Sequence, residues 1–257
     1  MTARVSTLAE QPALERVMRR FHRDAWPRFL RDDAVNALWS RLYTDFPQFQ
    51  LALSGRDGRV VAIGNTVPFA WNGTRRGLPD RLADVLARAS RGRERGTTPT
   101  ALVALAAIVD PSERGKGWST RLVRAMARLA ASRGLRALLA PVRPASKGDY
   151  PLTPMSEYAG WRRPDGTPFD PWLRVHWRLG ARALRITPRG NSVHARVGEW
   201  EEWTGLRFPR SGPYVVPGAF QPIRVDRRCD RVHYEEANVW MLHRVPRDGF
   251  RPRATTV

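Results

Sequence analysis

A short loop of glycines and basic residues is the part of this sequence best suited to chemistry. It spans residues 114–119 and reads Arg-Gly-Lys-Gly-Trp-Ser. An apolar run at 100–109, typical of a buried strand, precedes it, and apolar residues at helical spacing follow it from Trp118 to Leu129. A loop between a strand and a helix directs backbone N–H groups and the positive end of the helix dipole at one point. The sequence therefore predicts a binding site for a phosphorylated ligand.

Two well-known phosphate loops do not match these residues. A P-loop requires glycine where Asp110 stands, and serine or threonine where Gly117 stands. A dinucleotide-binding loop requires a glycine-like residue in place of Thr120. It also requires an acidic residue after the next strand, which the segment 136–144 lacks. Both alternatives fail at residues on which their mechanisms depend.

The elements that must position the loop form a strand–loop–helix–strand unit. Arg133 and Gly134 end the helix, and the apolar segment 136–142 follows as a second strand. Upstream, the segments 49–54 and 59–69 are typical of a β-hairpin joined by a glycine-containing turn. The sequence further predicts helices before residue 50, at 79–89, from Asp170 and at 199–204, and strands at 192–197 and 233–243. The pattern indicates an α/β fold.

The loop resembles the pyrophosphate loop of the GNAT superfamily of acyl-CoA-dependent N-acyltransferases. The family pattern is Arg or Gln, two residues, Gly, one residue, then Gly or Ala. Arg114 and Gly117 match it, while Ser119 departs from it but is also small. The preceding residues VDPSERGKG are similar to the family as well. The resemblance implies a central twisted mixed sheet flanked by helices, with splayed parallel core strands and, in this chain, an elaborated C-terminal third.

The same resemblance implies that acetyl-CoA or another acyl-CoA is the co-substrate. Backbone groups at 108–110 would contact pantetheine and the thioester oxygen, and the loop at 114–119 would hold the pyrophosphate. The implied cofactor-binding residues are Ile108, Val109, Asp110, Arg114, Gly115, Lys116, Gly117, Trp118 and Ser119.

Catalytic groups are less well marked. The segment 175–181 resembles the end of a family helix whose tyrosine protonates the departing CoA thiolate, and His176 occupies that place. Imidazole suits this task because its reference pKa is about 6.5; a histidine packed on a helix face is the alternative. The strand at 100–109 carries no acidic residue, so Glu157, Glu235 and Glu236 remain as candidate bases, with Glu157 preferred and surface carboxylates as the alternative. A low-pKa amine would need no base.

Composition limits the class of protein. The formal net charge is +20, nearly all of it from dispersed arginine, and no nucleic-acid recognition motif accompanies it, which argues against nucleic acid as the partner. No apolar run approaches the ~20 residues of a membrane span. Cys229 is the single cysteine, and we expect a structural thiol. The histidines show no metal-ligand spacing. We expect a cytoplasmic protein without a metal, and the sequence is compatible with a homodimer.

These observations predict one domain over 1–245, with a core at 49–186 and an elaboration at 187–245, followed by a flexible tail at 246–257. We expect the long connection at 144–169 to fold over the acceptor pocket. The predicted function is transfer of an acyl group, by direct attack on the thioester, to the amine of a small molecule. A protein-modifying acyltransferase and a non-catalytic GNAT-like binding or regulatory protein remain as alternatives.

Overall fold

The strands form a mixed sheet, as the sequence predicts. In the computed structural model, which describes residues 4–33 and 35–245, nine strands are hydrogen-bonded in the order β1-β2-β3-β4-β5-β9-β8-β7, and β6 pairs with β9. β4 and β5 are parallel, and the other strand pairs in the described ranges are antiparallel. The strands are β1 (Arg4–Thr7), β2 (Gln50–Ser54), β3 (Val60–Phe69), β4 (Ala101–Val109), β5 (Ala137–Val142), β6 (Arg182–Ala195), β7 (Gly212–Tyr214), β8 (Ile223–Asp226) and β9 (Arg231–Arg244).

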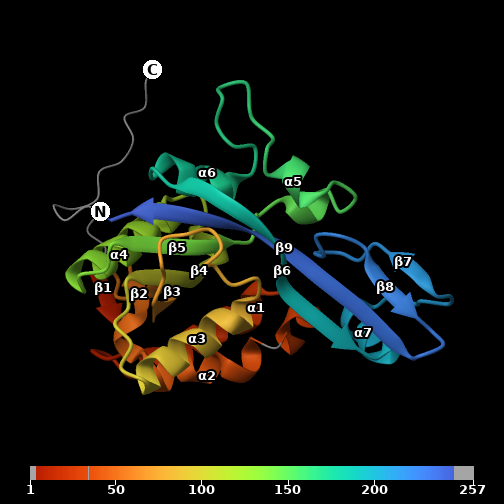
Figure 1. Cartoon of the computed structure of the whole chain (residues 1–257), viewed down its shortest axis with the longest axis horizontal. Helices are drawn as coiled ribbons and strands as arrows, with labels where there is room; N and C mark the ends of the chain where they lie inside the picture. The colour runs from red at the N-terminus through yellow and green to blue at the C-terminus, as the bar shows by residue number, and fades with distance from the viewer. Residues whose placement is uncertain (1–3, 34, 246–257) are drawn as a thin grey trace.

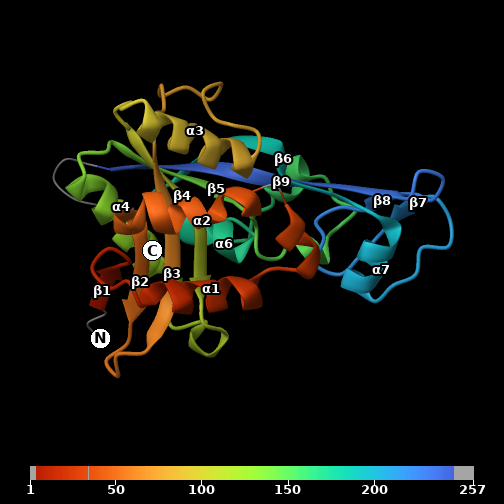
Figure 2. The ribbon, with the colours of Figure 1, turned by 90° about the horizontal axis from the view of Figure 1, so that it is seen from below.

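Helices cover both faces of this sheet. Gly64 on β3 faces Leu122 and Met126 of α4, whereas its neighbour Asn65 is hydrogen-bonded to His22 of α1. Because successive side chains of a strand point to opposite faces, α4 and α1 lie on opposite faces of the sheet. Figures 1 and 2 show α2 and α3 gathered with α1. The helices are α1 (Leu14–Ala25), α2 (Asn36–Asp45), α3 (Leu82–Glu94), α4 (Trp118–Ser132), α5 (Met155–Tyr158), α6 (Pro171–Arg178) and α7 (Val197–Thr204), with the 3-10 helices η1 (Arg28–Asp32), η2 (Pro47–Phe49), η3 (Pro111–Glu113) and η4 (Lys147–Asp149).

β4 and β5 separate after a short parallel pairing. Their register joins Ala101–Val103 to Ala137–Leu139, and β4 then runs on to Val109. On its other edge, the register with β3 shifts so that Leu105 is an extra residue in β4. A bulge of this kind bends a strand and ends regular pairing. The expected splayed core strands are therefore confirmed, and the split begins beside the bulge.

Two long strands carry the sheet beyond its main core. β9 pairs with β5 over 239–244 and with β8 over 231–233, while β6 follows its other edge. Figure 1 shows this ribbon extending to α7, β7 and β8, which enclose a second apolar cluster that includes Phe29 and Trp200. The strand expected at 192–197 begins instead at Arg182, and β7 and β8 were not predicted. The boundary expected at 186/187 falls inside β6.

The connection at 144–169 packs elsewhere than expected. Its aromatic side chains are Tyr150, Tyr158, Trp161 and Phe169. They pack against one another and belong to an apolar cluster with β5, α6 and β9. Within the described residues of this connection, Pro144 and Ala145 alone line the main cavity. The expectation that it covers the acceptor pocket is wrong, because its aromatic side chains fasten it to β5 and α6.

Several expectations concern the surface and the ends of the chain. Cys229 is exposed in the turn between β8 and β9, so the expected structural thiol is a surface thiol. None of the helices in the described ranges is long and apolar enough to cross a membrane. The same ranges contain no group of three or more His, Cys, Asp or Glu arranged to hold a metal ion. The tail predicted at 246–257 lies outside the described residues.

Candidate active site

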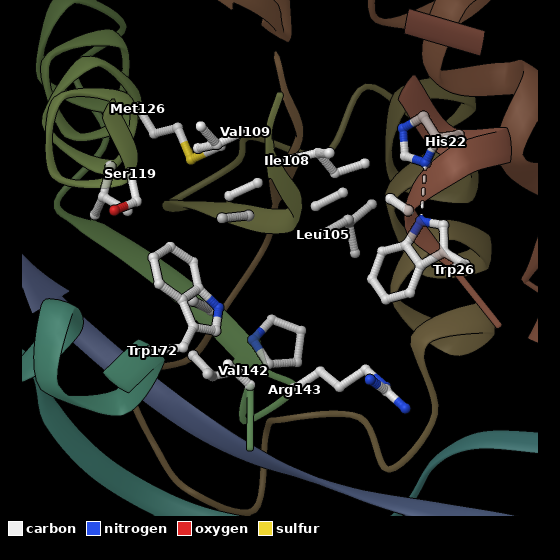
Figure 3. A pocket seen from close by; sticks show the side chains of 18 of the residues that line it. His22, Trp26, Leu105, Ile108, Val109, Ser119, Met126, Val142, Arg143 and Trp172 are labelled. Carbon is white, nitrogen blue, oxygen red and sulfur yellow. Dashed lines mark hydrogen bonds between the residues drawn. The ribbon is translucent and has the colours of Figure 1, made fainter. Parts of the chain in front are cut away.

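A cavity of about 1070 Å³ opens where β4 and β5 separate. At one end it reaches the loop before α4, and at the other it reaches α1 and α2. Figure 3 shows its apolar walls between these ends, formed by side chains of β4, α4, β5 and α6, which include Leu105, Val109, Met126, Val142 and Trp172. The cavity therefore extends from the glycine loop, along the split between β4 and β5, to α1 and α2; its end beside α1 and α2 is called the chamber below.

The glycine loop forms the first end of the cavity. Gly115 and Gly117 have φ angles of 79° and 80°, a left-handed conformation that favours glycine, and Gly117 is the N-cap of the 15-residue helix α4. The loop therefore turns the helix N-terminus toward the cavity, where a phosphate group is favoured. The predicted cofactor residues that line the cavity are Ile108, Val109, Arg114, Gly115, Gly117, Trp118 and Ser119.

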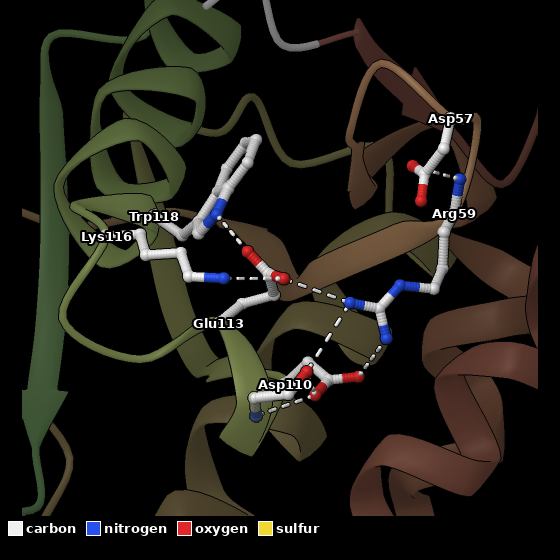
Figure 4. Close-up of polar contacts among 7 residues, drawn as sticks. Asp57, Arg59, Asp110, Glu113, Lys116 and Trp118 are labelled. Carbon is white, nitrogen blue, oxygen red and sulfur yellow. Dashed lines mark hydrogen bonds and ion pairs between the residues drawn. The ribbon is translucent and has the colours of Figure 1, made fainter.

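Asp110 and Lys116 are not among the lining residues, because other contacts occupy them. The backbone N–H of Asp110 donates to the carbonyl oxygen of Val61 at 2.9 Å. Lys116 Nζ donates to Glu113 Oε1 at 3.1 Å, and Arg59 Nη2 donates to the same oxygen at 3.0 Å (Figure 4). The hydrogen bond from Lys116 is the main cause that lowers the pKa of Glu113. The carboxylate of Glu113, directly before the glycine loop, thus pairs with two cationic side chains.

His176 lines the cavity from α6 but is deeply buried. Its Nδ1 lies 2.8 Å from Nε2 of His243 on β9, and its ring meets Trp172 edge-on at 4.5 Å between centroids. Burial, with a smaller contribution from His243, lowers the pKa of His176 well below its ordinary value. The ring is therefore neutral near pH 7. Its Nε2 has no hydrogen-bond partner in the described part of the chain, and the proton-donor role assigned to His176 stays a prediction.

The carboxylates considered as bases lie away from the end of the cavity beside α1. Glu157 is exposed on α5 and does not line the cavity. Glu235 lies 3.8 Å from Nε2 of His233 on the outer part of β9. Glu236 is fully buried and accepts two hydrogen bonds from Arg143, which does line the cavity. The structure brings none of these carboxylates to the chamber beside α1.

The chamber is built instead by residues outside the predicted catalytic and cofactor-binding residues. His22 of α1 lies with Nε2 2.7 Å from Asn65 Oδ1, and its Nδ1 accepts a hydrogen bond from Trp26 Nε1 at 3.2 Å (Figure 3). The ring of Trp39 on α2 meets His22 edge-on at 4.9 Å. The signal available in the sequence was a histidine next to Phe21 and four residues after Met18, within the helical region predicted before residue 50.

Arginines surround the chamber. The lining residues include Arg19 and Arg23 of α1 and Arg31 of η1. Among the described residues that line the whole cavity, Glu113 is the only carboxylate, and it belongs to the opposite end. Arg19 Nη2 pairs with Glu15 at 2.7 Å and Arg23 Nε lies 3.7 Å from Asp24, so part of this charge is offset. Because no carboxylate is among the described lining residues at this end, it still favours a neutral or anionic ligand group over a cationic one.

The comparisons agree with this geometry. No family model matches the sequence. The chain is 31% identical over 248 residues to a curated arginine N-acetyltransferase of Aspergillus versicolor, a match that covers 85% of this chain and 84% of that protein.

Solved structures share the fold. The loading GNATL domain of CurA from Lyngbya majuscula is 18% identical, with a TM-score of 0.62 and coverage of 95% of this chain and 98% of that domain. The GphF GNAT-like decarboxylase in complex with isobutyryl-CoA is also 18% identical, with a TM-score of 0.55 and coverage of 96% and 100%. With the split strands, the glycine loop and the relationship to a curated N-acetyltransferase, the chain belongs to the GNAT superfamily of acyl-CoA-dependent N-acyltransferases.

Proposed function

We propose that this N-acyltransferase uses acetyl-CoA to acetylate a small amine that also carries a carboxylate, with arginine as the first candidate. The observation that carries the proposal is the continuous cavity that links the loop at 114–119, the split between β4 and β5, and the arginine-lined chamber at α1. An amine bound in the chamber meets a thioester that enters from the loop.

The donor half of the site supports an acyl-CoA. The N-terminus of α4 and Arg114 favour the pyrophosphate. The backbone of β4 from Ala104 to Val109 is not paired with β5 and lines the cavity, so its polar groups are open to a pantetheine arm. Backbone N–H groups on this edge would stabilise the oxyanion of the tetrahedral intermediate, and loss of one such donor typically costs about 3–4 kcal/mol.

The acceptor half supports an amine with an anionic group. Arg19, Arg23 and Arg31 line the chamber, and a ligand carboxylate would pair with them, sharing Arg19 with Glu15. The same charges lower the pKa of a bound amine, which favours the neutral form that attacks the thioester. The arginine N-acetyltransferase relative supports arginine as the substrate to test first.

The test compares arginine with agmatine, which has the same guanidinium group and no carboxylate. We expect release of free thiol from acetyl-CoA with arginine, and kcat/KM at least tenfold lower with agmatine. Arg19→Gln should reduce that preference, because a carboxylate loses one of its partners. Equal kcat/KM for the two amines would refute the carboxylate preference. Absence of transfer to any amine, with acetyl-CoA still bound, would refute acetyl transfer itself.

A further inference from the structure

A chain of hydrogen bonds fixes the ring of His22. Gln50 is fully buried, and its Nε2 donates to the carbonyl oxygens of Phe46 at 2.8 Å and Thr66 at 2.9 Å. Its Oε1 is therefore turned to Asn65, whose Nδ2 donates to it at 3.0 Å. This arrangement leaves Asn65 Oδ1 facing His22 Nε2 at 2.7 Å.

The direction of this chain determines the tautomer of His22. A carbonyl oxygen accepts hydrogen bonds and cannot donate, so the proton of the neutral ring resides on Nε2. Nδ1 then carries a lone pair. It accepts a hydrogen bond from Trp26 Nε1 at 3.2 Å, the long end of the usual range, and a ligand N–H can replace that donor.

The hydrogen-bonded chain of Gln50, Asn65 and His22 ends at the boundary between the proposed donor and acceptor halves of the cavity. Asn65 on β3 is paired with Ala106 on β4, directly beside the bulge at Leu105. Leu105 and Ala106 line the cavity at the start of the split between β4 and β5, as His22 does from α1. In Figure 3, His22 and Trp26 lie across the cavity from Ser119, with Leu105 and Ile108 between them. His22 thus lies beside the end of the proposed cofactor path that is remote from the loop at 114–119.

The surroundings keep this ring neutral. Burial lowers the pKa of His22 to about 4, although the hydrogen bond to Asn65 opposes the change. Tyr43 of α2 lines the same chamber, and burial raises the pKa of this phenol, so it is neutral as well. Nδ1 therefore stays unprotonated throughout the neutral range, and its lone pair can accept from a ligand N–H that replaces the Trp26 donor.

We infer that His22 is the general base of the acyl transfer, with Asn65 and Gln50 as positioning residues. The inference rests on the proposed function. The neutral amine nitrogen attacks the thioester carbon and forms the C–N bond. The nitrogen of the adduct is then cationic and strongly acidic, and its proton passes to His22 Nδ1. The C–S bond breaks, the thiolate leaves and is protonated, and the imidazolium returns its proton to solvent. A weakly basic ring suffices because the proton comes from this acidic adduct rather than from a free ammonium ion.

The experiment compares His22→Gln with wild type in acetyl transfer to arginine and to hydroxylamine. Loss of a general base typically lowers the rate by about 10²–10⁴-fold, and we expect a loss in this range for arginine. Hydroxylamine gives a more acidic adduct, which loses its proton more readily without a base. The fall in its transfer rate in His22→Gln should therefore be at least tenfold smaller than the fall for arginine. The dissociation constant of acetyl-CoA should stay within twofold. His194→Gln, an exposed histidine of β6 outside this cavity, is the matched control and should act like wild type.

A measurement on the unmutated protein complements the kinetics. With ¹⁵N-labelled histidine, NMR should show His22 with its proton on Nε2 at pH 7, and Asn65→Leu should abolish that single tautomer. A proton on Nδ1 would overturn the inference, as would equal losses for the two amines or an active His22→Gln. Failure of wild type to acetylate any amine would instead overturn the proposed function, and the role of His22 with it.

Discussion

The ion pair between Arg143 and Glu236 offers a test of how the end of β5 is held. Glu236 on β9 is fully buried and accepts from Arg143 Nε at 2.8 Å and Nη2 at 2.9 Å. The hydroxyl group of Tyr234 donates a hydrogen bond to the same carboxylate at 2.8 Å. Burial opposes the charge of Arg143, but the charge and hydrogen bonds of Glu236 outweigh it, so that the pKa of Arg143 is raised. Arg143 is therefore held in its charged form against the carboxyl group of Glu236.

We predict that Glu236→Gln strongly destabilises the protein. The substitution keeps the shape of the side chain but leaves the Arg143 guanidinium, with 19% of its side chain exposed, without its counter-charge. Breaking a buried pair from one side costs about 3–5 kcal/mol. At roughly 2–4 °C per kcal/mol for a chain of this size, the unfolding midpoint should fall by about 10 °C. Scanning calorimetry or circular dichroism at pH 7 measures this change.

Two variants make the test specific. Glu235→Gln is the control, because it removes the neighbouring carboxylate, which lies 3.8 Å from His233 Nε2. It should lower the free energy of unfolding by less than about 0.5 kcal/mol. Adding Arg143→Met to Glu236→Gln removes the stranded charge and should recover most of the loss. A cost below about 1 kcal/mol for Glu236→Gln, or a double variant no more stable than the single one, would refute this account of the pair.

Two further predictions concern the cofactor loop and acid stability. Acetyl-CoA at about 100 times its dissociation constant should raise the midpoint by about 5–10 °C, and Gly117→Glu should abolish this rise. The control is Gly96→Glu, which imposes similar backbone strain at φ 65° in an open turn outside the cavity; this variant should keep the acetyl-CoA-induced rise of the midpoint. If acetyl-CoA also raises the midpoint of Gly117→Glu, the phosphate binds elsewhere. Burial lowers the pKa of His243 to about 4, whereas an unfolded histidine titrates near 6.5. The unfolded chain thus binds more protons in that window, and this ring alone should lower stability by about 2–3 kcal/mol at pH 4.5 relative to pH 7. Urea titrations should show at least this loss, because the pKa values of His22 and His176 are lowered as well; a flat profile would contradict buried neutral rings.

The elements that could be predicted from the sequence are those whose pattern is local. The hairpin of β2 and β3, the strand–loop–helix–strand unit and α6 with its Asp170 cap all carry strong apolar periodicity or turn residues. β6 was only partly predicted because it is an edge strand whose exposed positions include Arg182 and Arg189, so its apolar signal is weak. β7 and β8 have three and four residues, too few for a period to emerge.

The two ends of the cavity also differ in how far they could be predicted from the sequence. The loop at 114–119 is a contiguous motif, so its residues could be selected before the fold was known. The acceptor chamber is assembled from α1, η1 and α2, and from Asn65, 43 residues after His22. No local pattern joins such distant residues, and a search for a carboxylate led to Glu157, which lies outside the cavity.

The position of β9 has a consequence for synthesis of the chain. β5 is complete at Val142, but the strand that covers its outer edge is β9, which ends at Arg244, roughly a hundred residues later. At a translation rate of about 5–20 residues per second, that edge waits on the order of 5–20 s for its partner. An unpaired apolar strand is a template for aggregation during this interval. The cavity can therefore acquire its final walls only after β9 has been made, and the outer edge of β5 stays open to aggregation until then.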